Sequence, residues 1–290
     1  MSFSSWFRRS GSVLVWGAAF LFVGSAGWWL SGYMIPQPAV GIVRVYTDIW
    51  GGSLGLIQAQ IDEAREDDRV KAVVVQLDSP GGEVVASQTL FLELQDLRRD
   101  MPVVGSIDGM AASGAYYAAL GTDPIYAKPS SEVGNVGVWA FIPSDLPVND
   151  VVLASGPFKL TGSNRAEFVR ELEGIRQEFL ATVFSQRGDR LKLSQAELSQ
   201  GLLYPGREAL RLGLIDHVGS QTEAIAAAAE QAGIAHYAVV DLEDRVRDDF
   251  ADDVPVWGET WLGIADPETG ERALPYGVYL FYDARLRGVP

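Results

Sequence analysis

The sequence has no cysteine, only two histidines and only four lysines among its 290 residues. Without cysteine, the chain can form neither a disulfide bond nor a thiolate zinc site, and it has no cysteine nucleophile. Only His217 and His236 could act as imidazole bases. Positive charge is also scarce, since 23 Lys and Arg against 38 Asp and Glu give a net charge of -15. This negative balance argues against nucleic acid as a partner.

Charged residues are also absent from residues 13–30, a mostly apolar run of 18 residues. As a helix rising ~1.5 Å per residue, the run would be ~27 Å long, close to the thickness of a bilayer core. Arg8 and Arg9 precede it, and no charged residue follows before Arg44. Because positive residues favour the cytoplasmic side, we expect a single-pass anchor over residues 13–34 with the rest of the chain outside the cytoplasm.

The same run is compatible with a cleavable signal peptide, for which Ser25-Ala26-Gly27 would be the cleavage site. The bulky Trp28 and Trp29 directly after these small residues favour an uncleaved anchor instead. The predicted organisation is a cytoplasmic N-terminus (1–12), a transmembrane anchor (13–34), a proline-containing linker (35–40), a globular domain (41–240) and an acidic and aromatic C-terminal extension (241–290).

The globular part alternates between strand-like and helix-like patterns. Residues 70–77 are an almost continuous β-branched run, typical of a strand buried on both faces. Helical patterns follow at residues 83–99 and, most clearly, at residues 165–187. Further short strands are predicted at residues 103–107, 125–127 and 136–142, and shorter helices from Ser194, from Arg207 and near residues 222–232. This alternation predicts an α/β fold with a largely parallel sheet covered by helices on both faces.

The C-terminal extension differs from the globular part in composition. Residues 241–253 carry seven acidic side chains, and the aromatic segment 276–282 lies near the end of the chain. The acidic run lacks the spacing and the central glycine of a calcium-binding loop. We therefore interpret it as a solvated segment and expect neither a metal ion nor a cofactor in this protein.

A turn of small residues, Ala111-Ala112-Ser113-Gly114, connects a strand pattern to an apolar helix. A serine at such a corner can project its hydroxyl away from the backbone, and Gly114 offers an unhindered amide to a developing oxyanion. The alternative is that the small residues only let a helix pack closely on the sheet. A serine hydroxyl is a poor nucleophile without a base within hydrogen-bond reach, so the hypothesis for Ser113 depends on finding one.

Neither histidine has a distinctive setting, because His217 follows a helical pattern and His236 precedes a terminal strand. Three of the four lysines have ordinary surroundings. Lys71 and Lys192 stand beside other charged residues, and Lys128 precedes a proline in a loop. A histidine base for Ser113 stays possible, but the fourth lysine has the more unusual setting.

Lys159 lies in the segment Ser155-Gly156-Pro157-Phe158-Lys159-Leu160-Thr161-Gly162, and no other charged residue occurs between Val151 and Arg165. A lysine acts as a base only when it is neutral, so its pKa must fall by about three units, a shift worth ~4 kcal/mol. Burial without a carboxylate partner can produce such a shift. The alternative is an ordinary lysine whose long stem reaches the solvent.

A second turn, Asp78-Ser79-Pro80-Gly81-Gly82, follows the buried strand pattern of residues 70–77. Two glycines after a proline allow the backbone to point an amide into a cleft, as an oxyanion hole requires. The carboxyl ends of parallel strands are also where open α/β sheets place their sites. Because the serine turn follows the next strand along the chain, both turns are predicted to lie at the same edge of the sheet.

Five blocks of the sequence, in this order, resemble the signal peptide peptidase A (protease IV) family of serine peptidases. The blocks are Leu77-Asp78-Ser79-Pro80-Gly81-Gly82, Ala112-Ser113-Gly114-Ala115-Tyr116-Tyr117, Gly134-Asn135-Val136-Gly137-Val138, Gly156-Pro157-Phe158-Lys159, and Tyr204-Pro205-Gly206-Arg207-Glu208-Ala209 leading to Gly213-Leu214-Ile215-Asp216. The resemblance covers roughly residues 70–219 and implies a fold like that of the Clp protease and crotonase group.

The resemblance implies that Ser113 is the nucleophile, Lys159 the general base, and the amides of Gly82 and Gly114 the oxyanion hole, with Gly81 in support. It also implies a homo-oligomer, tethered to the inner (plasma) membrane of a bacterial cell with its peptidase domain extracytoplasmic. Its substrates would be peptides in or near the membrane, such as remnant signal peptides. In this family the serine and the lysine can come from neighbouring copies of the domain.

The chain departs from the family pattern at Asn135, where the family usually has a serine whose hydroxyl helps to position the lysine. An asparagine carbonyl could accept the same hydrogen bond. Two other functions remain alternatives. One is a catalytically silent, membrane-anchored scaffold of the same fold, and the other is a crotonase-like acyl-CoA enzyme, which would share the oxyanion turns but has no use for an activated serine.

Overall fold

The computed structural model describes residues 16–17, 19–25, 36–140, 162, 164–250, 264–265, 272–273 and 278–281. Residues 16–17 and 19–25 are helical, and the other residues of the predicted anchor lie outside the described part. None of the helices found among the described residues has the length and apolar character needed to cross a bilayer.

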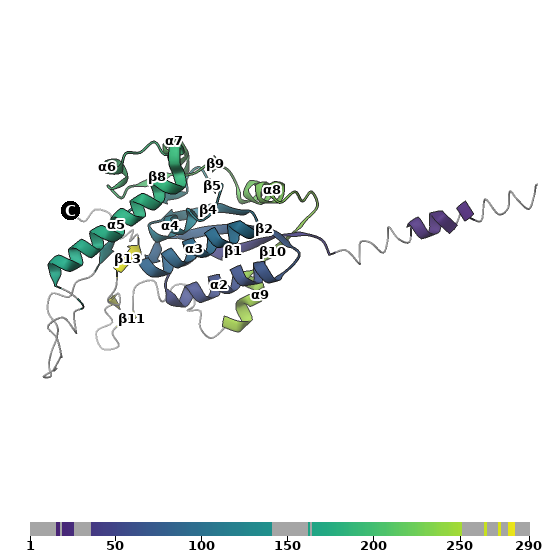
Figure 1. The fold of residues 1–290 in the computed structure, drawn as a ribbon, viewed down its shortest axis with the longest axis horizontal. Helices are drawn as coiled ribbons and strands as arrows, with labels where there is room; N and C mark the ends of the chain where they lie inside the picture. Colours follow the sequence, from purple (N-terminus) through teal and green to yellow (C-terminus); the bar gives the residue numbers. More distant parts are fainter. Residues whose placement is uncertain are drawn as a thin grey trace, which may run out of the picture.

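A largely parallel sheet forms the centre of the domain (Figure 1). Its main strands run in the order β10-β1-β2-β4-β5-β9, and all of these neighbours pair in parallel. They are β1 (Ala39–Val45), β2 (Val70–Ser79), β4 (Val103–Ala112), β5 (Ile125–Ala127), β9 (His217–Val218) and β10 (Ala238–Asp241). Beyond the end of β5, strand β6 (Glu132–Gly134) pairs with β4, and β8 (Leu203–Pro205) pairs with β6 in antiparallel.

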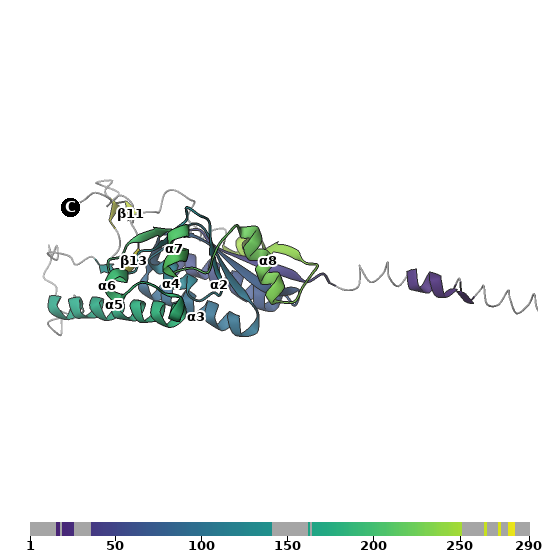
Figure 2. The ribbon, with the colours of Figure 1, turned by 90° about the horizontal axis from the view of Figure 1, so that it is seen from above.

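Helices cover both faces of this sheet, as the sequence pattern predicts. Val43, Val73 and Val75 belong to a core shared with α2 (Gly51–Glu66), α3 (Val84–Asp100) and α4 (Gly114–Ala119). The intervening residues Ile42 and Val74 point to the opposite face, where they pack against alanines of α8 (Gln221–Gln231). Figure 2 shows α8 and α3 on opposite sides of the strands.

The predicted helices α5 (Arg165–Arg187), α6 (Gln195–Leu198) and α7 (Gly206–Leu212) are present. The short helices η1 (Gly188–Arg190), α9 (Glu243–Val246) and η2 (Arg247–Phe250) were not predicted. The predicted strand at residues 136–142 is wrong in its start, because residues 136–138 form no strand and lie between β6, which ends at Gly134, and β7 (Trp139–Ala140). Residues 141–142 lie outside the described part of the chain. The apolar stripe of α5 is buried only toward its C-terminal end, at Phe179 and Val183, whereas Phe168 and Leu172 are half-buried.

Five of the described strands lie outside the central sheet. Strand β3 (Gly81–Glu83), strand β13 (Val278–Phe281) and β7 form a second sheet in the order β3-β13-β7. Strands β11 (Ile264–Ala265) and β12 (Arg272–Ala273) form an antiparallel pair. The second sheet therefore joins the turn after β2 to residues near the C-terminus.

A buried ion pair connects α5 to the end of the last sequence block. Arg187 is 2% exposed and donates two hydrogen bonds to the carboxylate of Asp216, at 2.9 Å and 2.8 Å. Asp216 also accepts the backbone N–H of Ile125 at 2.9 Å. Burial alone raises the pKa of Asp216, but the bonds from Arg187 and Ile125, together with the nearby charges of Arg187 and Arg190, outweigh it and lower the pKa. Asp216 thus anchors the start of β5 to α5.

Replacing Asp216 by asparagine is expected to lower the free energy of unfolding by ~3 kcal/mol at pH 7, because Arg187 then stays buried without its counter-charge. Folding lowers the pKa of Asp216, so its carboxylate stabilises the folded state fully at pH values above its pKa in the unfolded chain, ~4. This stabilisation is lost as the pH falls through the pKa of Asp216 in the folded protein. The difference between the native protein and Asp216→Asn should therefore shrink below about pH 4. Urea unfolding at several pH values measures it, with the exposed Asp62→Asn as a control that leaves stability nearly unchanged.

Candidate active site

The two glycine-containing turns meet at one edge of the central sheet. Strands β2 and β4 are parallel neighbours, and their last paired residues are Ser79 and Ala111. The turn that leads to Gly82 and the turn that contains Ser113 therefore leave the sheet side by side. Their closeness was predicted from the order of strands and turns in the sequence, and the pairing of β2 with β4 confirms it.

Ser113 has a strained backbone at the point where β4 ends and α4 begins. Its φ of 53° and ψ of -120° lie in a region that residues with a side chain rarely occupy. The N–H of Ser113 donates to the carbonyl oxygen of Gly134 at 2.8 Å, and its own carbonyl accepts the N–H of Tyr117 at 2.9 Å. These bonds hold the residue in a sharp strand-to-helix turn, which is the geometry that presents a nucleophilic hydroxyl in other hydrolases.

The helix that follows Ser113 is fixed by its two tyrosines. The hydroxyl of Tyr116, which is fully buried, donates to the carbonyl oxygen of Leu214 at 2.8 Å. The ring of Tyr117 packs edge-on against Phe91 and Phe179, with centroids 5.1 Å and 5.0 Å apart. Burial raises the pKa of both phenols, so they stay neutral and serve as structural groups. They fix α4 and with it the first amide of the helix, that of Gly114.

Gly82 lies in a position that no side chain could fill. Ile49 pairs with it in parallel, because the N–H of Ile49 donates to Gly81 (2.8 Å) and the carbonyl of Ile49 accepts from Glu83 (2.7 Å). A Cβ atom on Gly82 would overlap the carbonyl oxygen of Ile49. Gly81 has a φ of 103°, which a glycine adopts without strain. The double glycine is thus required by the backbone itself.

The two amides that could form an oxyanion hole come from different elements. Gly82 belongs to β3, and Gly114 is the first residue of α4, whose opening amides have no acceptor within the helix. Strand β3 lies against α4. The predicted oxyanion residues and Ser113 are therefore brought to the same place by β2, β3 and β4.

Asn135 is the only described residue besides Ser113 that has a side chain and a positive φ, at 55°. It directly follows Gly134, the hydrogen-bond partner of Ser113. Its Nδ2 donates to the carbonyl oxygen of Gly201 at 2.8 Å, which fixes the amide group. The two strained residues of the described chain thus occur together, as is common at functional sites.

Neither histidine lies near Ser113. His217 is opposite Tyr126 of β5, and Tyr126 is opposite Ser106 of β4, seven residues before Ser113. At ~3.3 Å per strand residue, this separation along the sheet is on the order of 20 Å. His236 precedes β10, which pairs with β1 at the far edge of the sheet. The histidine alternative is therefore not supported by the structure.

The described lysines are also unsuited to act as the base. Lys71 and Lys192 are exposed, and the Nζ of Lys192 donates to the carbonyl of Asp189 at 2.9 Å. The Nζ of Lys128 is held in an ion pair 3.0 Å from the carboxylate of Asp108. Lys159, the predicted base, lies outside the described residues, so its distance to Ser113 stays a prediction.

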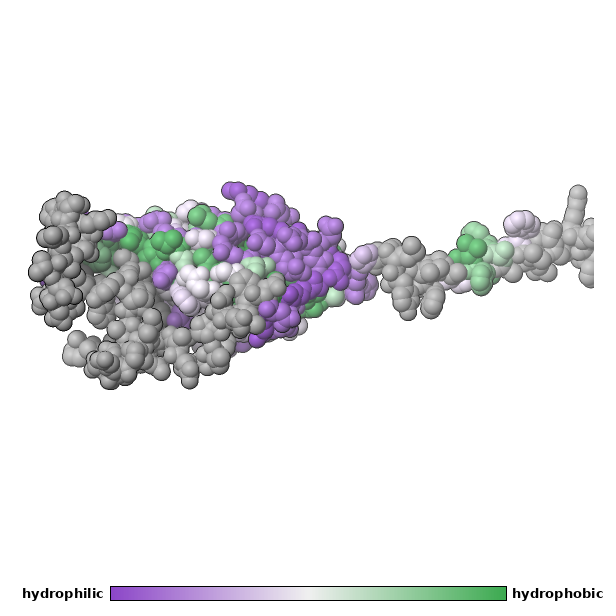
Figure 3. All heavy atoms as spheres, turned by 90° about the horizontal axis from the view of Figure 1, so that it is seen from below, coloured by the Kyte–Doolittle hydropathy of each residue, from purple (hydrophilic) through white to green (hydrophobic). Residues whose placement is uncertain are grey.

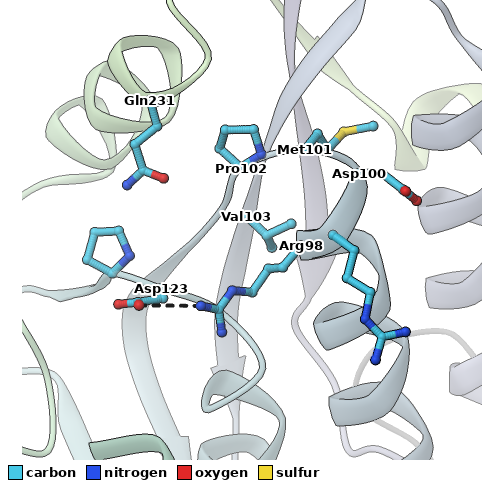
Figure 4. A pocket seen from close by; sticks show the side chains of 9 residues that line it. Arg98, Asp100, Met101, Pro102, Val103, Asp123 and Gln231 are labelled. Carbon is cyan, nitrogen blue, oxygen red and sulfur yellow. Dashed lines mark hydrogen bonds and ion pairs between the residues drawn. The ribbon is translucent and has the colours of Figure 1, made fainter.

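A hollow with a volume of about 510 Å³ lies away from this site. It is lined by Arg98, Pro102, Val103, Asp123 and Gln231 among others (Figure 4). Val103 is the first residue of β4, whereas Ser113 follows the last one. The hollow therefore lies at the opposite end of strand β4 from Ser113. In its wall, an ion pair between Arg98 and Asp123 (3.3 Å) connects α3 to the loop before β5.

Sequence reasoning missed Ile49 and gave no role to Tyr116. The role of Ile49 could not be inferred from the sequence, because an isolated apolar residue before a glycine-rich helix start has no distinguishing pattern. Tyr116 was part of a recognised block, but its bond to Leu214 depends on a contact between residues 98 positions apart. Both residues position the turns, and neither carries reactive chemistry.

Comparisons with known proteins agree with this geometry. The family model described as peptidase family S49 matches residues 95–144 and 149–235. A putative protease of Synechocystis sp. is 32% identical over 183 residues, which are 58% of this chain and 66% of the relative. A putative signal peptide peptidase SppA of Enterococcus faecium is 25% identical over 218 residues, covering 70% of this chain and 61% of the relative.

A third relative, Protease 4 of Salmonella typhi, is 31% identical over 192 residues, 62% of this chain and 31% of the relative. The chain therefore spans less than two thirds of the length of each of these three relatives. The family match includes Ser113 and Asn135 in its first segment and Lys159 in its second, whereas Gly82 precedes it.

Proposed function

Since this chain belongs to peptidase family S49, we propose that it is a serine endopeptidase with Ser113 as its nucleophile and Lys159 as its general base. The observation that carries this proposal is the backbone of Ser113. A φ of 53° with a ψ of -120° costs ~1–3 kcal/mol, and no packing requirement explains why a serine rather than a glycine is present there. A reactive hydroxyl would explain it.

In the proposed reaction, the neutral amine of Lys159 takes the proton of the Ser113 hydroxyl while Oγ attacks a peptide carbonyl. The amides of Gly82 and Gly114 hold the oxyanion of the tetrahedral intermediate. Lys159 then returns the proton to the leaving amine as the C–N bond breaks. Water, deprotonated by the same amine, hydrolyses the acyl-enzyme and restores Ser113. Asn135 supports the site by holding the turn next to Ser113.

We also propose that the chain is anchored in the inner membrane of a bacterial cell by residues 13–34, with the peptidase domain outside the cytoplasm. Large apolar side chains of the helical residues 16–17 and 19–25 support this, because Trp16, Phe20, Leu21, Phe22 and Val23 are 68% to 82% exposed. Figure 3 shows hydrophobic (green) atoms in this described N-terminal segment. Such exposure in water is unfavourable, and a bilayer would cover these side chains.

The substrates we propose are peptides left in or near the membrane, such as remnant signal peptides, cut by a homo-oligomer. The half-covered apolar side chains of Phe168 and Leu172 on α5, together with the exposed Val169, support assembly with further copies of the chain. An anchored peptidase would meet membrane peptides without diffusing through the solvent. The name of the Enterococcus faecium relative agrees with this substrate class.

A fluorophosphonate probe tests the nucleophile. We expect the native full-length protein in detergent to be labelled at Ser113, located by peptide mass spectrometry, and Ser113→Ala to stay unlabelled. Ser87→Ala is the matched control, because Ser87 is equally buried and its hydroxyl has no hydrogen-bond partner in the described part of the chain. Labelling that persists in Ser113→Ala would refute the assignment, and an unlabelled, inactive native oligomer would favour a silent scaffold.

A further inference from the structure

Strand β13, near the C-terminus, lies between two segments that flank the candidate site. It pairs in antiparallel with β3, where Tyr279, Leu280 and Phe281 are opposite Glu83, Gly82 and Gly81. On its other edge, Val278 and Tyr279 are opposite Ala140 and Trp139 of β7. Figure 1 shows β13 beside the ends of α3 and α4, and both helices are in contact with it. The chain's own residues 278–281 thus form the middle strand of this sheet.

The direction of the hydrogen bonds places Leu280 opposite the candidate oxyanion hole. Ile49 accepts the N–H of Glu83 and donates to the carbonyl of Gly81, so those two groups point away from β13. Successive residues of a strand point their backbone groups to opposite edges. The N–H and the carbonyl of Gly82 therefore face β13, and their partner in the register is Leu280. The amide assigned to the oxyanion is directed at the backbone of Leu280.

A substrate peptide would need this same place. Its scissile carbonyl must reach the amide of Gly82 beside Ser113, and an extended peptide gains affinity by pairing with strand edges. The edges of β3 and β7 that face β13 are the ones available here. We propose that residues 278–281 occupy the substrate groove as a substrate-like strand, with Leu280 where the residue before the scissile bond binds. This inference deepens the proposed function and rests on it.

The tail would then act as an intramolecular competitive inhibitor. A tethered peptide meets its site at an effective concentration on the order of 1 mM. If the same segment binds with a dissociation constant of ~100 μM as a free peptide, the tether raises the apparent KM for an external peptide by roughly tenfold. The kcat is unchanged, because a substrate that has displaced the tail meets the same catalytic groups.

The test compares three full-length proteins in detergent micelles: the native chain, Leu280→Pro and Arg285→Pro. Proline at position 280 removes the N–H that faces Gly82, so it weakens the pairing of β13 with β3. Arg285 lies beyond β13 and provides a proline control of the same tail. Intact mass verifies that each tail is complete. We expect the KM for a quenched fluorescent peptide to fall about tenfold in Leu280→Pro at constant kcat, and to stay at the native value in Arg285→Pro.

A synthetic peptide of residues 276–282 gives a second readout. It should inhibit Leu280→Pro competitively, with an inhibition constant of ~100 μM, while a peptide of the same composition in reversed order should not. Equal KM values in the native chain and Leu280→Pro, with Ser113 labelled in both, would overturn the proposal for the tail and leave the proposed peptidase intact. Absence of both cleavage and labelling in all three proteins would overturn the two together.

Discussion

Replacing Ser113 by glycine should abolish peptide cleavage and, in the same protein, stabilise the fold. Removal of the hydroxyl removes the nucleophile, and we expect kcat to fall by ~10⁴ or more, equivalent to ~5.5 kcal/mol of transition-state stabilisation. At the same time, the φ of 53° and ψ of -120° become allowed without strain. After subtraction of the extra chain entropy of glycine, the net gain in the free energy of unfolding is expected to be ~1 kcal/mol.

Ser113→Ala separates the two effects. Alanine also lacks the hydroxyl, so it should be as inactive as the glycine variant, but its Cβ keeps the backbone strain and gives no such gain in stability. Peptide hydrolysis and urea unfolding of the native protein and both variants are the measurements. A glycine variant no more stable than the alanine variant would show that the turn is relaxed around Ser113. Native turnover in either variant would remove Ser113 from the mechanism.

Opposite effects of one residue on activity and stability would also distinguish a functional turn from a packing turn. If Ala111-Ala112-Ser113-Gly114 existed only to bring α4 close to the sheet, a glycine at position 113 would satisfy the packing at lower cost. The second strained residue, Asn135, follows the carbonyl that holds Ser113. Strain at two contacting turns is more readily explained by a site than by two independent accidents of folding.

Much of the central sheet could be predicted from local sequence. The uninterrupted β-branched run of residues 70–77 indicates a buried parallel strand, and the glycine-containing turns mark where strands end. Because parallel strands end at the same edge, this reasoning also predicts that the turns of Gly82 and Ser113 lie together. The pairing of Ser79 with Ala111 confirms their closeness, while the catalytic roles stay predictions.

The true end of β4 could not be read from the sequence. The apolar pattern stops at Ile107, yet the strand continues to Ala112. Asp78 of the neighbouring strand accepts the N–H of Met110 at 3.0 Å, and Gly109 leaves the space that this carboxylate occupies. A polar side chain therefore extends the strand through a contact between residues 32 positions apart. Periodicity within one segment contains no information about such a contact.

The pairing of β13 with β3 is a more extreme case of the same limitation. Its two partners are separated by almost 200 residues, and the aromatic segment 276–282 by itself indicates only that a strand forms there. The edges of β3 and β7 that face each other across β13 supply the reason for the pairing, because strand edges take up an extended segment. Sequence reasoning could name the segment, but the groove that receives it exists only in the folded domain.

Replacing Lys159 by alanine is expected to lower kcat by ~10³ or more while the fold is retained. The structure strengthens this prediction by excluding other bases among the described residues. The two histidines, His217 and His236, lie too far from Ser113 along the sheet. Lys128 is held in an ion pair with Asp108. Lys192→Ala is the matched control, since Lys192 is exposed and its amine donates to the carbonyl of Asp189. It should leave kcat at the native value.

Lys159→Arg sharpens the test, because a guanidinium keeps the positive charge but does not lose its proton near neutral pH. If Lys159 only holds a charge near the site, arginine should restore activity. If it is the base, both variants should be inactive, and kcat/KM of the native enzyme should fall as the pH is lowered and the amine becomes protonated. Single-turnover cleavage and circular dichroism of the four proteins provide the measurements. Near-native turnover in Lys159→Ala would show that a group other than Lys159 is the general base for Ser113.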